Sequence, residues 1–461
     1  MTVSEQPPRT DPAGSASPPP TLRPRRLSPL QWALKGWARV AVNVVYRDVE
    51  VDPAARRALT GPVVLVANHT NALGDPVVLL ARLPGFPHFL AAATWWKSRP
   101  ARWLFNLAGV IPVHRSRDGD TRSNTDSFAS CHEALARGGT IALYPEGEMH
   151  NGPGLLPLRT GAARIALSAA AEANVGDVVI LPVAVVYADK SRFRSRAAVN
   201  IGTPVPVAPW VQQYREDAPA TTRALTDAIA AALGDIATLS ESVDDAYVLG
   251  RAAALGVADL EPESRRFGRE HSLARSLRDA VVGDKAAPSV RFRVLEAAVA
   301  AHDTDLARLH DTDVGRAVRL EHPAPDRRRR NRRELALLTP VAAVGVVVNS
   351  PVLVGTAAAN RLARGSGWPA TIKGVIGSGL SVLTWGAGAF WITRRIDRRA
   401  GLIGGLAGPL GGWGLLAWTA RWQRERNERW HTRVERHQPE ELAAARRSRA
   451  TLKALVKDAV G

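Results

Sequence analysis

Short apolar runs alternate with longer mixed stretches between residues 50 and 210, and this alternation constrains the fold more than any other feature. Strands are expected where the apolar runs fall, at 63–67, 88–91, 110–113, 140–144, 179–186 and 198–201. Helices are expected between them, at 76–83, 102–108, 124–137 and 160–173. Continuous apolar strands separated by helices are typical of an α/β layer with a buried, largely parallel sheet. Residues 27–51, just before this segment, predict a helix followed by a strand.

The most informative local segment is ANHTNALGDPVVLL, residues 67–80. It delivers His69 from a strand end and places Asp75 six positions later. An imidazole titrates near neutrality and a carboxylate can hold its tautomer, so the pair suits general-base catalysis. On a continuous helix of 3.6 residues per turn, side chains six positions apart lie about a third of a turn out of line. Pairing therefore requires residues 70–74 to form a loop or an irregular turn, which the asparagine and glycine there allow.

Three further blocks follow in order: GVIPVHR at 109–115, IALYPEGEMHNGPGLLPLRTGAARIAL at 141–167, and VVILPVAVVY at 178–187. Together with NHTNALGD, they resemble the four sequence blocks of the glycerolipid acyltransferases, which acylate glycerol 3-phosphate and lysophosphatidate. The resemblance covers residues 35–210. Five residues separate the histidine from the aspartate, and Glu-Met-His-Asn follows the Glu-Gly pair. Both features are similar to a subgroup that includes fungal glycerol-3-phosphate/dihydroxyacetone-phosphate acyltransferases.

The resemblance implies an α/β fold with a mixed, largely parallel sheet, and a site gathered at one rim of that sheet. His69 would deprotonate the acceptor hydroxyl, with Asp75 as its partner. Glu146 would help to position the acceptor, and Gly147 would let the backbone approach it. Arg115 suits a phosphate, because guanidinium binds phosphate bidentately. Further candidate substrate-binding residues are Asn68, His150, Arg159 and Pro182.

Plain structural roles stay open for several of these positions. Glu146 can equally cap a helix, and His150 can be a polar loop residue. Pro182 follows a buried strand and borders the acyl-donor site by resemblance, but it is equally a strand-edge proline. Arg115 can be a surface residue. Cys131 is interpreted as a packed helix residue, and a single cysteine excludes an internal disulfide and a cysteine-based metal cluster.

The formal net charge of +18 over 461 residues implies an anionic partner or surface. Anionic lipid headgroups and nucleic acid are the two candidates. The basic runs adjoin apolar stretches rather than interleaving with aromatic residues on a soluble module, which disfavours nucleic acid.

Composition divides the chain into five parts. They are a Pro-rich, disordered tail at 1–27, a catalytic domain with an N-terminal amphipathic helix at 28–210, a helical region at 211–325, a basic cluster with apolar helices at 326–425, and a basic helical tail at 426–461. The amphipathic helix carries tryptophans and basic residues. Packing on the catalytic core and binding at a membrane interface both stay open for it.

Three apolar stretches follow the basic run DRRRRNRRE. They occupy 335–359, 372–393 and 402–418, and each approaches or exceeds the ~20 residues that cross a bilayer as a helix. Abundant glycine and flanking tryptophan favour membrane helices. Prolines interrupt the runs, so hairpins entering one leaflet and a buried soluble bundle stay open as alternatives.

These features together predict a membrane-associated O-acyltransferase with its catalytic domain on the cytoplasmic side. It would transfer a fatty acyl group from acyl-CoA or acyl carrier protein to lysophosphatidate, with glycerol 3-phosphate or dihydroxyacetone phosphate as the alternative acceptor. No metal or prosthetic group is implied, and no covalent acyl-enzyme is expected. A non-catalytic membrane-binding protein that keeps the fold is the other class considered, and the intact set of His69, Asp75, Arg115 and Glu146 disfavours it.

Overall fold

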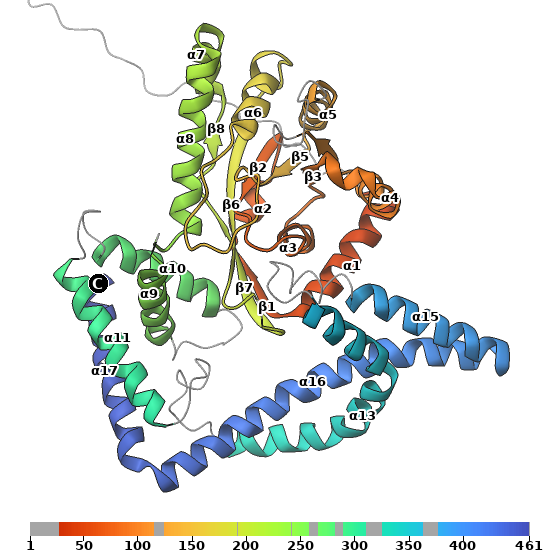
Figure 1. Ribbon diagram of the computed structural model, residues 1–461, viewed down its shortest axis with the longest axis vertical. Coiled ribbons are helices and arrows are strands. Elements are labelled where there is room, and N and C mark those ends of the chain that lie inside the picture. The colour runs from red at the N-terminus through yellow and green to blue at the C-terminus, as the bar shows by residue number, and fades with distance from the viewer. Residues whose placement is uncertain are drawn as a thin grey trace, which may run out of the picture.

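The computed structural model describes residues 27–114, 124–190, 192–240, 242–257, 266–281, 289–309, 325–362 and 377–460. Figure 1 shows a central sheet covered by helices, a second group of helices beside one sheet edge, and long helices that extend away from both.

Within the described residues, eight strands form one mixed sheet in the order β1-β7-β6-β2-β5-β3-β4, and β8 pairs with the start of β6. Strands β2 to β6 run parallel to one another, β7 and β8 run antiparallel to β6, and β1 runs parallel to β7. The predicted mixed, largely parallel sheet is confirmed, although the sequence did not indicate β8. The bounds are β1 Tyr46–Val51, β2 Val63–Ala67, β3 His88–Ala92, β4 Ile111–Val113, β5 Thr140–Leu143, β6 Val179–Tyr187, β7 Ser195–Ile201 and β8 Val205–Pro206.

Helices cover both faces of this sheet. Val64 and Val66 point toward one apolar core, whereas Val63 and Leu65 point toward the other. Both cores are fully buried, which explains why the strands are apolar throughout rather than alternating with polar residues. The first face is covered by α5 (Asn124–Ala136), α6 (Gly161–Ala171) and α8 (Ala218–Ala237), and the second by α1 (Pro29–Val45) and α3 (Gly74–Arg82).

Pro182 lies inside β6 and does not follow a strand, which corrects its expected position. β6 pairs with β8 at residues 179–180 and with β7 from residue 183 onward, so Pro182 sits where the neighbour changes. The Pro182 carbonyl accepts a hydrogen bond from Gly202 N at 2.9 Å. Gly202 lies in the turn between β7 and β8. The nitrogen of Pro182 is directed to this turn and not to a paired strand, so the absence of an N–H on proline removes no hydrogen bond between strands.

The helical region forms a second bundle with the end of the chain. Leu249, Leu277, Leu295 and Leu452 meet in one buried core. The C-terminal helix therefore packs against the helical region and is not a separate tail. The bundle consists of α9 (Val243–Gly256), α10 (Arg266–Val281), α11 (Val290–Arg308) and α17 (Pro439–Val460).

Helix α10 docks this bundle on the β1–β7 edge of the sheet. The Glu50 carboxylate accepts hydrogen bonds from Phe267 N at 2.7 Å and Gly268 N at 2.9 Å, near the N-terminus of α10. Arg196 on β7 makes a bidentate pair with Glu270, at 2.9 and 3.0 Å. The carboxylate at a helix N-terminus and the paired guanidinium fix the bundle to the catalytic sheet.

Three long helices make up the apolar region: α13 (Pro325–Leu362), α15 (Gly377–Arg395) and α16 (Arg398–His437). Among the described residues, two segments are long and apolar enough to cross a membrane, Arg328–Ala359 and Arg398–His437. Three apolar stretches were expected. The stretch at 372–393 is described only from residue 377, as α15, which is not among these two candidate spans. The boundary expected at residue 425 falls inside α16, which runs on without interruption.

Glycine and one buried amide hold these helices together. A Cβ atom on Gly345 of α13 would collide with the Gly411 carbonyl of α16, so the two backbones cross in direct contact. Asn349 of α13 donates to the Gly408 carbonyl at 3.2 Å and accepts from Trp385 Nε1 of α15 at 3.0 Å. This amide therefore joins all three helices.

Candidate active site

The turn between His69 and Asp75 has the irregular geometry that the pairing required. Residues 70–73 form a turn, and α3 begins at Gly74, so Asp75 lies in its first turn. Ala72 adopts a positive φ of 25°. The Asn71 amide occupies the space that a Cβ on Gly74 would need, at 2.6 Å. The tight turn thus depends on a glycine at this position.

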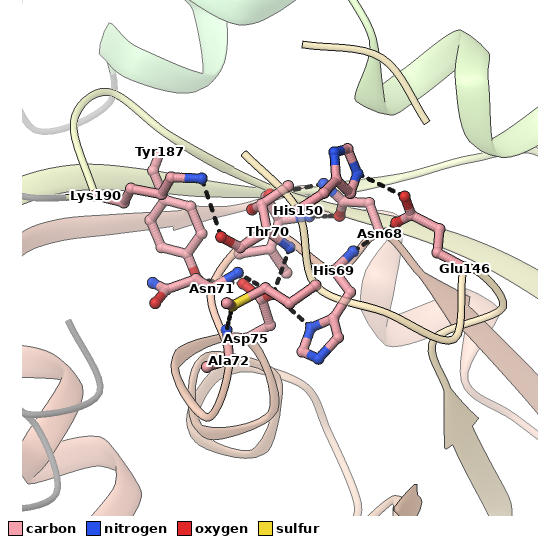
Figure 2. Close-up of polar contacts among 12 residues, drawn as sticks. Asn68, His69, Thr70, Asn71, Ala72, Asp75, Glu146, His150, Tyr187 and Lys190 are labelled. Carbon is pink, nitrogen blue, oxygen red and sulfur yellow. Dashed lines mark hydrogen bonds and ion pairs between the residues drawn. The ribbon is translucent and has the colours of Figure 1, made fainter. Parts of the chain in front are cut away.

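The expected contact between His69 and Asp75 is present (Figure 2). His69 Nδ1 lies 3.1 Å from Asp75 Oδ2, and the same oxygen accepts hydrogen bonds from Thr70 N at 3.0 Å and Asn71 N at 2.8 Å. The Asp75 side chain is 0% exposed and the His69 side chain is 19% exposed. With Nδ1 turned to the carboxylate, Nε2 is the ring nitrogen left to act as a base.

Tyr187 provides a fourth donor to this carboxylate, which the sequence did not reveal. Its hydroxyl donates to Asp75 Oδ1 at 2.7 Å from the last residue of β6. The period-two pattern of β6 carried a signal, because Val183, Val185 and Tyr187 share the face that α3 covers. A phenol at the end of an otherwise aliphatic face indicates a polar neighbour.

A second tyrosine supports the same turn. The Tyr46 hydroxyl accepts a hydrogen bond from Asn71 Nδ2 at 3.0 Å, and the Tyr46 and Tyr187 rings lie 5.5 Å apart. Burial is the main cause that raises the pKa of both phenols well above the usual value, and the charge of Asp75 raises it further. Both hydroxyls therefore stay protonated at physiological pH and can act as donors.

Glu146 clamps the loop after β5 to the backbone of His69. Glu146 Oε1 accepts from His69 N at 2.8 Å, and Oε2 accepts from Leu156 N at 2.9 Å. His150 N donates in turn to the His69 carbonyl at 3.2 Å. The carboxylate is buried and does not cap a helix, so that alternative is not what the structure shows. Its role in positioning the acceptor stays a prediction.

His150 lies against the same carboxylate. Its Nδ1 accepts a hydrogen bond from Gly152 N at 3.1 Å, which places a ring proton on Nε2. Nε2 lies 2.6 Å from Glu146 Oε2. The imidazole therefore closes the polar cluster behind His69, while the predicted phosphate contact of His150 remains untested.

The structure also places three of the other predicted binding residues, Gly147, Arg159 and Asn68. Gly147 has a φ of 72°, where glycine is favoured, and Arg159 packs beside it with an exposed guanidinium. Asn68 is buried and tied to β6, because its Oδ1 accepts from Val185 N at 2.8 Å and its Nδ2 donates to Val185 O at 3.2 Å. Asn68 thus holds the end of β2 in place. Arg115 lies outside the described residues.

Two further residues, which the sequence analysis did not predict, contact His69 or the turn that follows it. The Tyr144 ring stacks on the His69 imidazole, with ring centroids 4.1 Å apart and an interplanar angle of 17°. Lys190 Nζ donates to the Thr70 carbonyl at 3.0 Å (Figure 2). Burial lowers the pKa of Lys190, and the nearby charge of Asp75 opposes that shift. Lys190 thus places a cation at the turn that joins His69 to Asp75, and we call this pair of residues the dyad.

Within the described part of the chain, no three His, Cys, Asp or Glu side chains gather into a group that could hold a metal ion. Cys131 is completely buried on α5, and burial raises the pKa of its thiol to about 12. The contact between His69 and the buried Asp75 carboxylate suits proton transfer by an imidazole.

The segment that carries this site is similar to known proteins. The family model described as Acyltransferase matches residues 46–186, which include the dyad, Glu146 and β6. Glycerol-3-phosphate O-acyltransferase 2 of Saccharomyces cerevisiae is 34% identical over 99 residues, which cover 22% of this chain and 13% of that protein.

Two shorter relatives match over a longer segment. The lyso-ornithine lipid O-acyltransferase of Brucella abortus is 32% identical over 163 residues, covering 33% of this chain and 57% of that protein. The 1-acyl-sn-glycerol-3-phosphate acyltransferase alpha of Ovis aries is 30% identical over 160 residues, covering 34% and 54%. This chain thus spans from 13% to 57% of the length of these three relatives.

Sheet, dyad and family match together define residues 46–186 as an acyltransferase domain. This domain is similar to the glycerolipid acyltransferases, in agreement with the resemblance of the four sequence blocks.

Proposed function

We propose that the protein transfers a fatty acyl group from a thioester donor to the hydroxyl of a glycerol-phosphate lipid precursor. The observation that carries this proposal is the contact between His69 Nδ1 and the buried Asp75 carboxylate, which leaves Nε2 as the basic nitrogen. Acyl transfer to a hydroxyl needs such a base, and the Thr70 and Asn71 amides keep the carboxylate oriented behind it.

The reaction follows from this geometry in two steps. His69 Nε2 takes the proton of the acceptor hydroxyl as its oxygen attacks the thioester carbonyl carbon, and Asp75 stabilises the imidazolium that forms. The tetrahedral intermediate then collapses, the carbon–sulfur bond breaks, and the imidazolium returns its proton to the leaving thiolate. The products are an ester and a free thiol, and no acyl group is attached to the protein.

We propose lysophosphatidate as the acceptor, with glycerol 3-phosphate and dihydroxyacetone phosphate as alternatives. The relatives' names include glycerol-3-phosphate and 1-acyl-sn-glycerol-3-phosphate acyltransferases, so they support a phosphorylated glycerol acceptor of either kind. Arg159 lies exposed beside the Gly147 backbone and provides positive charge near the rim. Arg115 is the further phosphate ligand that the sequence predicts. The donor is acyl-CoA or acyl carrier protein, and no resident cofactor is part of the proposal.

We further propose that α13 and α16 hold the protein in a membrane of anionic lipids, with the catalytic domain on the cytoplasmic side. The two apolar segments and the basic run at 326–334 support this arrangement. A carbonate wash should leave the full chain in the membrane fraction. Release by carbonate would show that the helices do not enter the bilayer.

One assay tests the activity. Purified protein is given labelled palmitoyl-CoA or palmitoyl-acyl carrier protein, and lysophosphatidate, glycerol 3-phosphate, dihydroxyacetone phosphate and lyso-ornithine lipid are offered separately. We expect transfer to lysophosphatidate, and none with His69→Ala. Turnover in the His69→Ala protein would refute the proposed base. A lack of transfer to every acceptor would favour a membrane-binding protein that keeps the fold.

A further inference from the structure

The connection between β3 and β4 leaves the sheet at the same edge as His69. It consists of a 3-10 helix, η1 (Ala93–Lys97), followed by α4 (Arg99–Leu107). β3 runs parallel to β2 through β5, so the end of β3 and the end of β2 lie at one edge. Because His69 follows β2 and η1 follows β3 at once, η1 begins at the rim that carries the base.

This connection exposes large apolar side chains. Trp103 is 67% exposed, Leu104 is 43% exposed and Trp95 is 40% exposed, and these three residues form what we call the aromatic rim surface. Ring contacts join Trp95 of η1 to α4. The Phe105 ring lies 6.2 Å from the Trp95 ring and 5.2 Å from the Trp96 ring. Exposed groups of large apolar side chains mark sites of interaction with proteins or membranes.

Helix α1 brings a second exposed apolar strip to the same rim. β1 runs parallel to β7, and β7 runs antiparallel to β6, which is parallel to β2. The end of α1, directly before β1, therefore lies at the edge where β2 ends. Val40 and Val44 on this helix are 64% and 40% exposed. Apolar side chains thus flank the base from the β3–β4 side and from the β1 side.

Cationic side chains lie on the same two elements as the aromatic rim surface. Lys97, Arg99 and Arg102 are all exposed, and the chain carries a net charge of +18. Tryptophan mixed with lysine and arginine suits the headgroup layer of a bilayer, where the ring lies among acyl chains and the cation meets phosphate. Figure 1 shows α4, α1 and the apolar helix α15 toward the same side of the molecule.

We propose that the aromatic rim surface of η1 and α4 inserts into the headgroup layer of an anionic bilayer and holds the His69 rim against it. The occupant is the lipid surface itself and not a protein partner, because the exposed groups combine apolar rings with cations. This inference rests on the proposed function and deepens it. A lipid acceptor could then present its hydroxyl to His69 without leaving the membrane.

Site-directed labelling of the full chain tests the insertion. Cys131 is buried and its thiol pKa is raised to about 12, so it should not compete for label near neutral pH. A bimane label is placed by Trp103→Cys, and a matched control label by Val290→Cys on α11, where the native side chain is 70% exposed. Both proteins are reconstituted in vesicles of equal parts phosphatidylcholine and phosphatidylglycerol. We expect a blue shift and quenching by lipid-borne quenchers at position 103 alone.

Two outcomes overturn the inference. A label at position 103 that stays as open to aqueous quenchers as the label at 290 shows that the surface does not enter the bilayer. Kinetics give the second criterion. Trp103→Glu should raise the apparent KM for lysophosphatidate in vesicles by about tenfold, and leave the KM for a short-chain, monomeric lysophosphatidate unchanged. Equal changes for both forms would place the effect inside the protein.

Failure of this inference and failure of the proposed function are distinguishable. If the protein is active but the label at position 103 stays in water, the proposed acyl transfer stands and the proposed docking surface is refuted. If the label is buried in lipid but the protein is inactive with every acceptor, the docking surface stands and the proposed reaction is refuted.

Discussion

Replacing Tyr187 by phenylalanine tests how the carboxylate behind the base is held. The change removes one hydroxyl and keeps the ring that packs beside Tyr46. Asp75 Oδ1 then loses its 2.7 Å donor, while Oδ2 keeps the contacts from His69, Thr70 and Asn71. The dyad remains, but its carboxylate is held on one oxygen only.

The expected loss can be worked from these contacts. A hydrogen bond to a charged group contributes about 1.5–3 kcal/mol. Because three contacts to Asp75 persist, the lower end applies, and about 1.4 kcal/mol corresponds to a tenfold change in rate. We therefore expect kcat to fall about tenfold in Tyr187→Phe. The KM for the acceptor should change little, because the hydroxyl faces Asp75 and not the substrate.

The matched control is Tyr46→Phe, which removes a hydroxyl that accepts from Asn71 and lies beside Tyr187 but does not donate to Asp75. Turnover with labelled palmitoyl-CoA and lysophosphatidate is compared across both variants, with circular dichroism and thermal unfolding to verify the fold. We expect kcat to fall less than about threefold in Tyr46→Phe. Unchanged kcat in Tyr187→Phe, or an equal loss in both variants with equal destabilisation, would refute the reasoning.

The remaining predictions concern three other buried groups. Glu146→Gln should lower the midpoint of urea unfolding by the equivalent of about 1–3 kcal/mol and reduce kcat. A neutral amide accepts less strongly than a carboxylate from the backbone N–H groups of His69 and Leu156. An unchanged midpoint would show that these two hydrogen bonds do not stabilise the fold. Burial, with Arg39 as a smaller cause, lowers the pKa of Lys35 to about 8 from 10.5. Between pH 8 and pH 10.5 the unfolded chain therefore binds more protons at Lys35 than the folded chain does. The thermal stability of the protein, measured relative to Lys35→Met, should rise as pH increases from about 8 to about 10.5. If this relative stability does not change with pH, the Leu83 and Gly85 carbonyls keep the ammonium charged in the folded state. Iodoacetamide at pH 8 should label Cys131 only after unfolding, as mass spectrometry would show, and rapid native labelling would contradict its burial.

The sequence by itself determined the strands, the order of the catalytic blocks and the need for a turn before Asp75. These features are local: an apolar run of four to nine residues indicates a buried strand, and Asn71 and Gly74 permit a tight turn wherever they stand. The apolar stretches could likewise be found from composition, and two of them fall in described segments that are long and apolar enough to cross a membrane.

Only the tertiary structure decided which distant groups meet around the dyad. Tyr187 and Asp75 are 112 positions apart, and Glu146 lies 77 positions from His69. Nothing in either local pattern states that the face of β6 carrying Tyr187 packs on α3. That contact follows from the strand order β6-β2-β5, which sets β6 beside the strand that delivers His69. The order β1-β7-β6 likewise brings Tyr46 of β1 to this edge. The residues of one strand do not state which strand becomes its neighbour, so the sequence alone could not predict this contact.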